Sequence, residues 1–98
     1  MGAALQRGGG AVNEADAARL LFDAGLTPRH WGNGPGDTYA RHAHGYHKVL
    51  YCVAGSITFH TDDGDLRLVA GDRLDVPPGT EHAASVGPDG VRCVEGGG

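Results

Sequence analysis

The sequence has little of what nucleic-acid-binding and membrane proteins require. Its 98 residues include a single Lys, Lys48, show no cluster of basic side chains and carry a formal net charge of −4. A duplex-binding protein needs clustered Lys and Arg to neutralise phosphates, so we expect no nucleic-acid partner. The longest apolar run, residues 49–54, is far shorter than the roughly 18 residues of a membrane-spanning helix, so we expect no membrane partner either.

Cysteine is also scarce. Cys52 and Cys93 are too few for a disulfide framework. At the N-terminus we see no secretion signal, which would be an apolar segment flanked by Lys or Arg and followed by a cleavage site of small residues. We therefore expect two reduced thiols in a cytoplasmic protein. A bridge between the two is the alternative, since both fall in strand-like runs.

Glycine and proline, by contrast, are abundant, with 18 and 5 residues. The length is that of one domain, which we divide into an N-terminal extension (1–35), a β-domain (36–95) and a loose tail (96–98). Residues 1–10 are also expected to be loose. A helix is predicted over residues 13–26, because Asn13 can cap it, Glu14 and Asp16 suit its positive end, and Gly25 can terminate it.

From residue 37 onward the pattern predicts β-strands. Asp63-Gly64 is a typical hairpin turn, and seven short strands at this spacing favour an all-β antiparallel sandwich or barrel. Gly- and Pro-rich segments separate them, including a loop through Trp31. The predicted strands cover residues 38–44, 47–53, 56–60, 65–69, 72–76, 81–86 and 90–95.

Histidine supplies the clearest chemical signal. His42 and His44 are two residues apart, so in a strand both imidazoles project from the same face. With a third imidazole from a neighbouring strand, such a pair can hold Zn, Fe, Mn, Ni or Cu. By itself the pair is a weak signal, because solvated histidines are common.

The spacing around these histidines resembles the two motifs of the cupin family. The first motif is Gly, five residues, His-x-His, three or four residues, Glu, six residues, Gly. The second is Gly, five residues, Pro-x-Gly, two residues, His, three residues, Asn, with Val86 here in place of the Asn. The matching positions are Gly36, His42, His44, Gly55, Gly71, Pro77, Gly79 and His82.

The resemblance implies a small antiparallel jelly-roll β-barrel preceded by the short helix. It also implies one divalent transition metal per chain, held by His42, His44 and His82 inside the barrel. The sequence departs from the family at the motif's Glu, where Lys48 stands. We favour His47 as a fourth ligand, turned inward by a bulge near Gly45.

The alternative is an outward His47, as strict strand alternation predicts. Lys48, Leu50 and Cys52 would then share the inner face, and Lys48 would clamp an anionic ligand. Near the histidines, Tyr39, Arg41 and Tyr46 are further candidates for lining the pocket mouth. No catalytic acid or base is identified.

The resemblance implies a metal-binding protein that accepts a small organic ligand. One hypothesis is an enzyme acting on a small chelating substrate, either a dioxygenase or an isomerase or decarboxylase. The alternative is a non-catalytic binding or sensor module, and a metal-free structural domain is the third. We also expect a homodimer. If Lys48 keeps the position of the motif's Glu, then Val49, Tyr51 and Val53 face outward and form an apolar patch for this contact.

Overall fold

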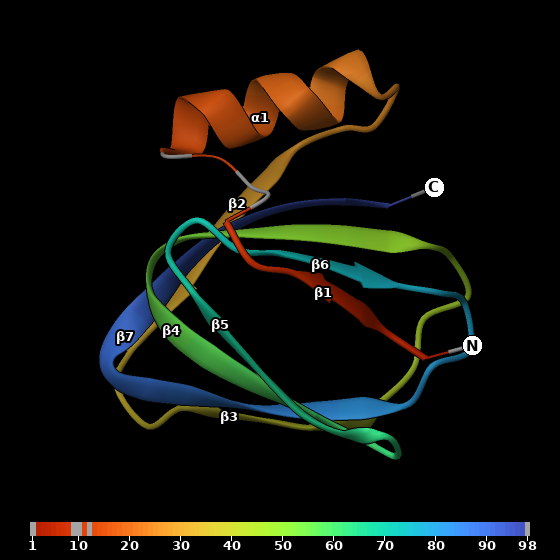
Figure 1. Ribbon diagram of the computed structural model, residues 1–98, viewed down its shortest axis with the longest axis vertical. Helices are drawn as coiled ribbons and strands as arrows, with labels where there is room; N and C mark the ends of the chain where they lie inside the picture. Colours follow the sequence, from red (N-terminus) through yellow and green to blue (C-terminus); the bar gives the residue numbers. More distant parts are fainter. Residues whose placement is uncertain (1, 9–10, 12, 98) are drawn as a thin grey trace.

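The computed structural model describes residues 2–8, 11 and 13–97, which form one helix and seven strands (Figure 1). All the strand pairings are antiparallel, as the sequence predicted. The elements are β1 (Ala4–Gln6), α1 (Glu14–Asp23), β2 (Arg29–Asn33), β3 (Thr38–His42), β4 (Lys48–Thr61), β5 (Gly64–Val69), β6 (Arg73–Val76) and β7 (His82–Gly97).

Two long strands, β4 and β7, bend from one layer of the fold into the other. The first part of β4 pairs with β6 and with the end of β7, and β1 and β2 extend this layer at its two edges. The second part of β4 pairs with β5 and with the start of β7, which also pairs with β3. In Figure 1 the two layers face each other, and both contribute side chains to the core cluster.

The bend in β4 lies around Gly55, and the register with β7 shifts on both sides of this residue, between Cys52 and Ala54 and between Gly55 and Ile57. Gly55 has φ +71°, and a Cβ there would lie 2.0 Å from the carbonyl oxygen of Gly90. The sequence predicted separate strands on each side of Gly55, and likewise on each side of residues 87–89. These predictions were wrong in one respect, because both glycine-containing segments bend a continuous strand instead of ending it.

Two short strands occupy segments predicted to be irregular. β1 lies within residues 1–10 and pairs with β6, and β2 contains Trp31 and pairs with β7. Neither segment is rich in β-branched residues, so cross-strand pairing and not local propensity makes them strands. The predicted strand over residues 38–44 is shorter than expected, since β3 ends at His42 and leaves His44 in the following loop.

The predicted helix is confirmed, although it is shorter than residues 13–26. The Asn13 side chain accepts a hydrogen bond from the amide of Asp16 at 2.9 Å, and Gly25, with φ +83°, follows the last turn. The helix packs on the outer face of one layer (Figure 1). The cluster formed there consists of Ala11, Ala17, Leu21, Val49, Tyr51 and Val94.

This packing corrects the predicted dimer surface. Val49 and Tyr51 do face outward from the barrel, but they are only 7% and 3% exposed because α1 covers them. The chain's own helix therefore buries the apolar face that we assigned to a second copy.

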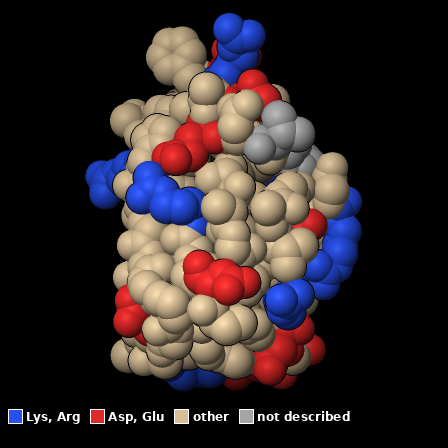
Figure 2. All heavy atoms as spheres, turned by 90° about the vertical axis from the view of Figure 1, so that its left-hand side faces the viewer, with Lys and Arg blue, Asp and Glu red and all other residues tan. Residues whose placement is uncertain are grey.

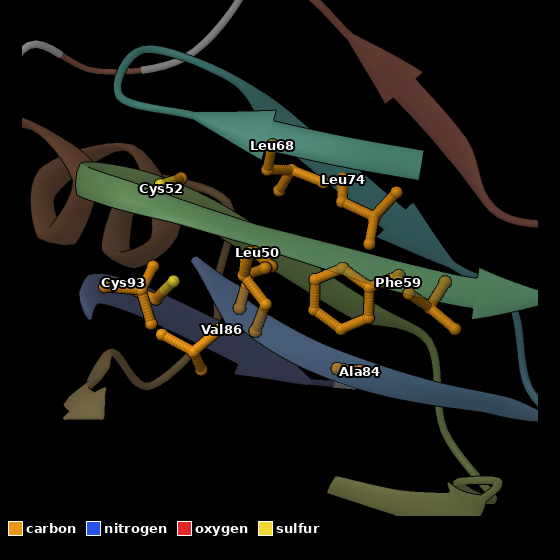
Figure 3. Packing of buried hydrophobic residues seen from close by; sticks show 11 residues of the cluster. Leu50, Cys52, Phe59, Leu68, Leu74, Ala84, Val86 and Cys93 are labelled. Atoms are coloured by element: carbon orange, nitrogen blue, oxygen red, sulfur yellow. The ribbon is translucent and has the colours of Figure 1, made fainter. Parts of the chain in front are cut away.

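The main core lies between the layers. Figure 3 shows its side chains, contributed by β4, β5, β6 and β7, pointing toward one another. Leu50 and Cys52 belong to it, so the even-numbered positions at the start of β4 face the interior. Beyond the Gly55 bend the odd-numbered positions Ile57 and Phe59 face inward, which is the change of parity that a bulge produces.

Charged side chains of both signs lie close together on the surface. In Figure 2, Lys and Arg side chains are interspersed with Asp and Glu over the face shown. Several pairs join distant parts of the chain, such as Arg92 with Glu14 at 3.0 Å and Arg7 with Asp72 at 3.0 Å. Among the described residues, no helix is both long and apolar enough to cross a bilayer.

Candidate metal centre

Three imidazoles meet at one end of the space between the layers. His42 ends β3, His44 follows in the loop, and His82 begins β7. One ring nitrogen of each lies within 4.8 Å of the other two. The ring centroids are 4.4 Å apart for His42 and His82, 4.8 Å for His42 and His44, and 5.4 Å for His44 and His82.

Backbone pairing brings the two motifs together. His42 and His82 are register partners in the β3–β7 ladder. The amide of Gly79, which has φ +78° in the turn before β7, donates a hydrogen bond of 2.8 Å to the carbonyl of His44. The Pro77-Pro78-Gly79 corner therefore fixes His82 beside the loop that carries His44.

Hydrogen bonds set the tautomers of two rings. Nδ1 of His42 lies 2.7 Å from the carbonyl oxygen of Ala40, and Nδ1 of His82 lies 2.9 Å from that of Thr80. Because a carbonyl can only accept, each Nδ1 carries the proton and each Nε2 presents a lone pair. This is the orientation that metal-ligating histidines commonly have.

The remaining nitrogens fit a metal. Nε2 of His44 and Nε2 of His82 are buried and have no hydrogen-bond partner. A buried polar atom without a partner is costly, and such atoms occur where a ligand or ion completes the site. Three converging imidazole nitrogens are a donor set suited to Zn, Cu, Fe or Ni.

The environment keeps two of these rings neutral near pH 7. Burial lowers the pKa of His44, and the nearby Lys48 ammonium and the other two imidazoles lower it further. Burial also lowers the pKa of His82, against a smaller opposing effect of its bond to Thr80. Neutral imidazole is the form that coordinates a metal, so the site is prepared for one.

A cavity of about 390 Å³ adjoins the three imidazoles. Aromatic and aliphatic side chains from both layers form much of its wall. The Phe59 ring lies 5.9 Å from that of His82, and Trp31 and Tyr39 pack edge to face at 5.9 Å. The lining residues are Arg29, His30, Trp31, Tyr39, His42, His44, Lys48, Ile57, Phe59, His82, Ala84 and Glu95.

Tyr39 reaches this cavity because β3 is irregular. The register with β7 shifts between Tyr39 and His42. These two residues are three positions apart on β3, whereas their partners on β7, Ala84 and His82, are only two positions apart. Without such a bulge, positions 39 and 42 would face opposite sides of the strand. The Tyr39 hydroxyl donates a hydrogen bond to the Asn33 side chain, and burial raises the pKa of Tyr39.

The structure does not bring His47 into the cluster. Its Nε2 lies 3.2 Å from a carboxylate oxygen of Asp75, and its side chain is 44% exposed. No bulge turns it inward, because β4 begins at Lys48 with regular alternation. The favoured prediction for His47 therefore gives way to its alternative, in which Lys48 faces the cavity.

Lys48 forms a polar group with two residues of the neighbouring strands. Its ammonium lies 3.1 Å from Oε1 of Glu95, which also accepts a 2.6 Å hydrogen bond from the indole of Trp31. The Lys48 and Glu95 side chains are only 10% and 16% exposed. The position of the motif's Glu thus holds a cation, paired with a Glu from another strand.

Four other predicted pocket residues lie outside the cavity lining. Arg41 is exposed and pairs with Asp62 and Glu81 at 2.6 and 3.2 Å. Leu50 and Cys52 belong to the main core. Tyr46 packs beside His44, with ring centroids 5.0 Å apart, and is 40% exposed.

Glu95 and Phe59 are cavity residues that the sequence reasoning missed. Glu95 has the same parity on β7 as the core residues Val91 and Cys93. An acidic residue at an inward position of the last strand was the available signal. Phe59 is two residues from Ile57 and therefore faces the same side of the strand. That this side is the inward one could be predicted only once the Gly55 bend was known.

Comparisons with known proteins agree with this arrangement. The curated protein reported as quercetin 2,3-dioxygenase, from Bacillus subtilis, is 42% identical over 52 residues, which is 51% of this chain but only 15% of the relative. An RmlC-like cupin from Shewanella frigidimarina superposes with a TM-score of 0.66 at 29% identity, over 74% of this chain and 64% of that one. A cupin superfamily protein from Desulfitobacterium hafniense has the same fold, with a TM-score of 0.66 at 18% identity over 74% of this chain and 65% of that one.

The family assignment follows from a match over most of the described chain. The model of the AraC-like ligand binding domain matches residues 26–94, which begin shortly after the helix and end within β7. The solved relatives confirm the jelly-roll architecture that the two motifs implied. The chain is a small cupin and belongs to the family of AraC-like ligand binding domains.

Proposed function

We propose that the protein binds one divalent transition metal through Nε2 of His42, His44 and His82, and acts as a dioxygenase-like enzyme on a small chelating organic substrate. The observation that carries the proposal is the pair of buried, unpartnered Nε2 atoms of His44 and His82, directed toward a third imidazole. The limited identity with the Bacillus dioxygenase supports this reaction class.

The protein side chains have defined tasks in this proposal. A bound redox metal with open coordination positions would supply the capacity to bind oxygen and a chelating substrate. The carbonyls of Ala40 and Thr80 hold two imidazoles in the ligating tautomer. Trp31, Tyr39 and Phe59 line the cavity and present flat apolar surfaces to a substrate.

A second candidate function is non-catalytic binding of a small molecule. The match to the AraC-like ligand binding domain favours it, because that family is described by ligand binding and not by a reaction. Both candidates use the same cavity. An isomerase or decarboxylase would use the metal as a Lewis acid in the same position. The homodimer and the cytoplasmic location stay predictions from the sequence.

Metal analysis and oxygen uptake separate these candidates. Protein purified without added metal, or reconstituted with Fe, Mn, Ni, Cu or Zn, is analysed for metal content and then mixed with catechols, diketones and thiols in an oxygen electrode. We expect about one metal per chain and oxygen uptake with at least one substrate class. Metal without uptake, together with reversible ligand binding, would favour the binding function, and absence of metal would overturn the proposed site.

A further inference from the structure

The cavity holds a lysine in an unusual setting. Lys48 is 8% exposed, and regular alternation along the start of β4 directs it inward with Leu50 and Cys52. Lysine is seldom buried to this extent unless a partner compensates the loss of hydration. Glu95, at 3.1 Å, is that partner among the described residues.

The pair leaves the ammonium with donors to spare. An ammonium has three N–H donors, whereas Oε1 of Glu95 accepts from both Lys48 and the Trp31 indole. The carboxylate is therefore shared, and Trp31 holds it in place. Lys48 can keep this contact and still donate to an acceptor that enters the cavity.

The balance of charge favours an anionic acceptor. The cavity lining includes two permanent cations, Arg29 and Lys48, and one carboxylate, Glu95. Arg29 and Glu95 are register partners on β2 and β7, so the three groups lie at one end of the wall. A divalent metal on the histidines would add further positive charge. Lys48 is buried whereas Arg29 is exposed, and a buried cation attracts an anion more strongly than an exposed one does.

The apolar wall favours a flat ligand. Trp31 and Phe59 belong to different layers of the fold, and both line the cavity beside the histidines. A volume of about 390 Å³ is in the range of pockets that enclose small organic molecules. Aromatic side chains contribute area and ring contacts that select planar ligands.

We infer that Lys48 sets the ligand class of the pocket: a planar aromatic molecule with a carboxylate or enolate oxygen that the Lys48 ammonium receives, while the ring lies against Trp31 and Phe59. This inference rests on the proposed function, since it assigns the ligand of the same cavity. Lys48 is thus a specificity-determining residue at the position where the cupin motif has a metal-binding Glu.

Trp31 provides a direct test because it is the only Trp in the sequence and lies in the cavity wall. Its fluorescence is titrated in zinc-loaded protein, where no oxidation occurs, with 2-hydroxybenzoate and with the neutral 2-hydroxybenzamide. We expect the anion to bind more tightly than the amide. In Lys48→Met the anion should bind about tenfold more weakly or worse, as expected for loss of a charged hydrogen bond, whereas the amide should change little.

Matched variants exclude indirect effects. Arg67→Met removes an exposed cation of β5 and should leave both ligands unaffected. Lys48→Met alone leaves the Glu95 carboxylate without its cationic partner, so the double variant K48M/E95Q removes both charges. If the anion still binds weakly to it, Lys48 acts directly, and Lys48→Arg should recover part of the affinity.

Two outcomes would overturn the inference. One is equal binding of anion and amide, or no binding of the anion, and the other is normal anion binding to K48M/E95Q. Zinc content measured on the same samples tests the proposed function separately. Zinc bound without charge selectivity would refute the Lys48 inference alone, whereas missing zinc would refute the metal site and leave the apoprotein titration to test Lys48.

Discussion

The six histidines divide into two groups whose surroundings differ in kind. Three have a carboxylate partner: His30 contacts Glu14 at 2.9 Å, His47 contacts Asp75 at 3.2 Å and His60 contacts Asp65 at 2.9 Å. The other three, His42, His44 and His82, converge on the cavity, and none has a carboxylate hydrogen-bond partner among the described residues.

The comparison shows that the partner, and not the residue type, distinguishes a surface imidazole from a candidate ligand. A carboxylate oxygen accepts a hydrogen bond from the ring and so occupies one of its nitrogens. In the cavity, backbone carbonyls occupy Nδ1 of His42 and His82, and Nε2 stays buried without a partner in His44 and His82. Exposed pairs contribute little to stability, whereas unpartnered buried nitrogens have a cost that a bound metal would offset.

The largest effect should come from removing a cavity histidine. His82→Ala takes away a buried imidazole nitrogen, and we expect metal affinity to fall by at least about 100-fold, measured by competition with a chelator. His60→Ala is the matched control from the surface group and should bind metal normally. Because His82 is buried, His44→Ala serves as a second variant, with thermal unfolding to verify folding. Full metal content in both cavity variants would contradict the assignment.

The second largest effect should be a loss of stability in acid that comes from the cavity histidines. The pKa values of His44 and His82 are lowered in the folded apoprotein, so the unfolded chain takes up these protons first as the pH falls. The free energy of unfolding should therefore decline as the pH falls below about 6.5, the usual histidine value. Urea unfolding at pH 7.5 and 5.5 measures this, and a double His44→Ala/His82→Ala variant should show a weaker dependence. If the double variant loses as much unfolding free energy between pH 7.5 and 5.5 as the unmodified protein does, the acid sensitivity comes from other groups.

The smallest effect on metal affinity should follow removal of His47, which lies next to the start of β4. His47→Ala breaks an exposed contact with Asp75, worth about 1 kcal/mol or less, and metal affinity should change by no more than about twofold. Chelator competition on His47→Ala and Lys48→Ala checks this point. A large loss of metal affinity in His47→Ala alone would restore His47 as a fourth ligand.

The sequence predicted the cavity histidines because the spacing of its two motifs resembles that of the cupin family. A tight Pro-Pro-Gly corner and a His-x-His pair each fix a short segment, and their order along the chain limits how they meet. The helix was also predictable, since Asn13 and Gly25 are local signals at its ends.

What the sequence could not supply depends on contacts between distant segments. β1 and β2 are strands because β6 and β7 pair with them, which no local propensity records. Gly55 was read as a strand end, but the close approach of the Gly90 carbonyl makes it a bend within β4. Glu95 reaches the cavity only through the register of β7 with β2 and β4.

Anomalous diffraction from crystals of the zinc-loaded protein would test the central claim most directly. We predict one strong peak at about 2.0–2.1 Å from Nε2 of His42, His44 and His82. A peak beside His47 and Asp75, or no peak near the three cavity imidazoles in protein that retains zinc, would contradict the account.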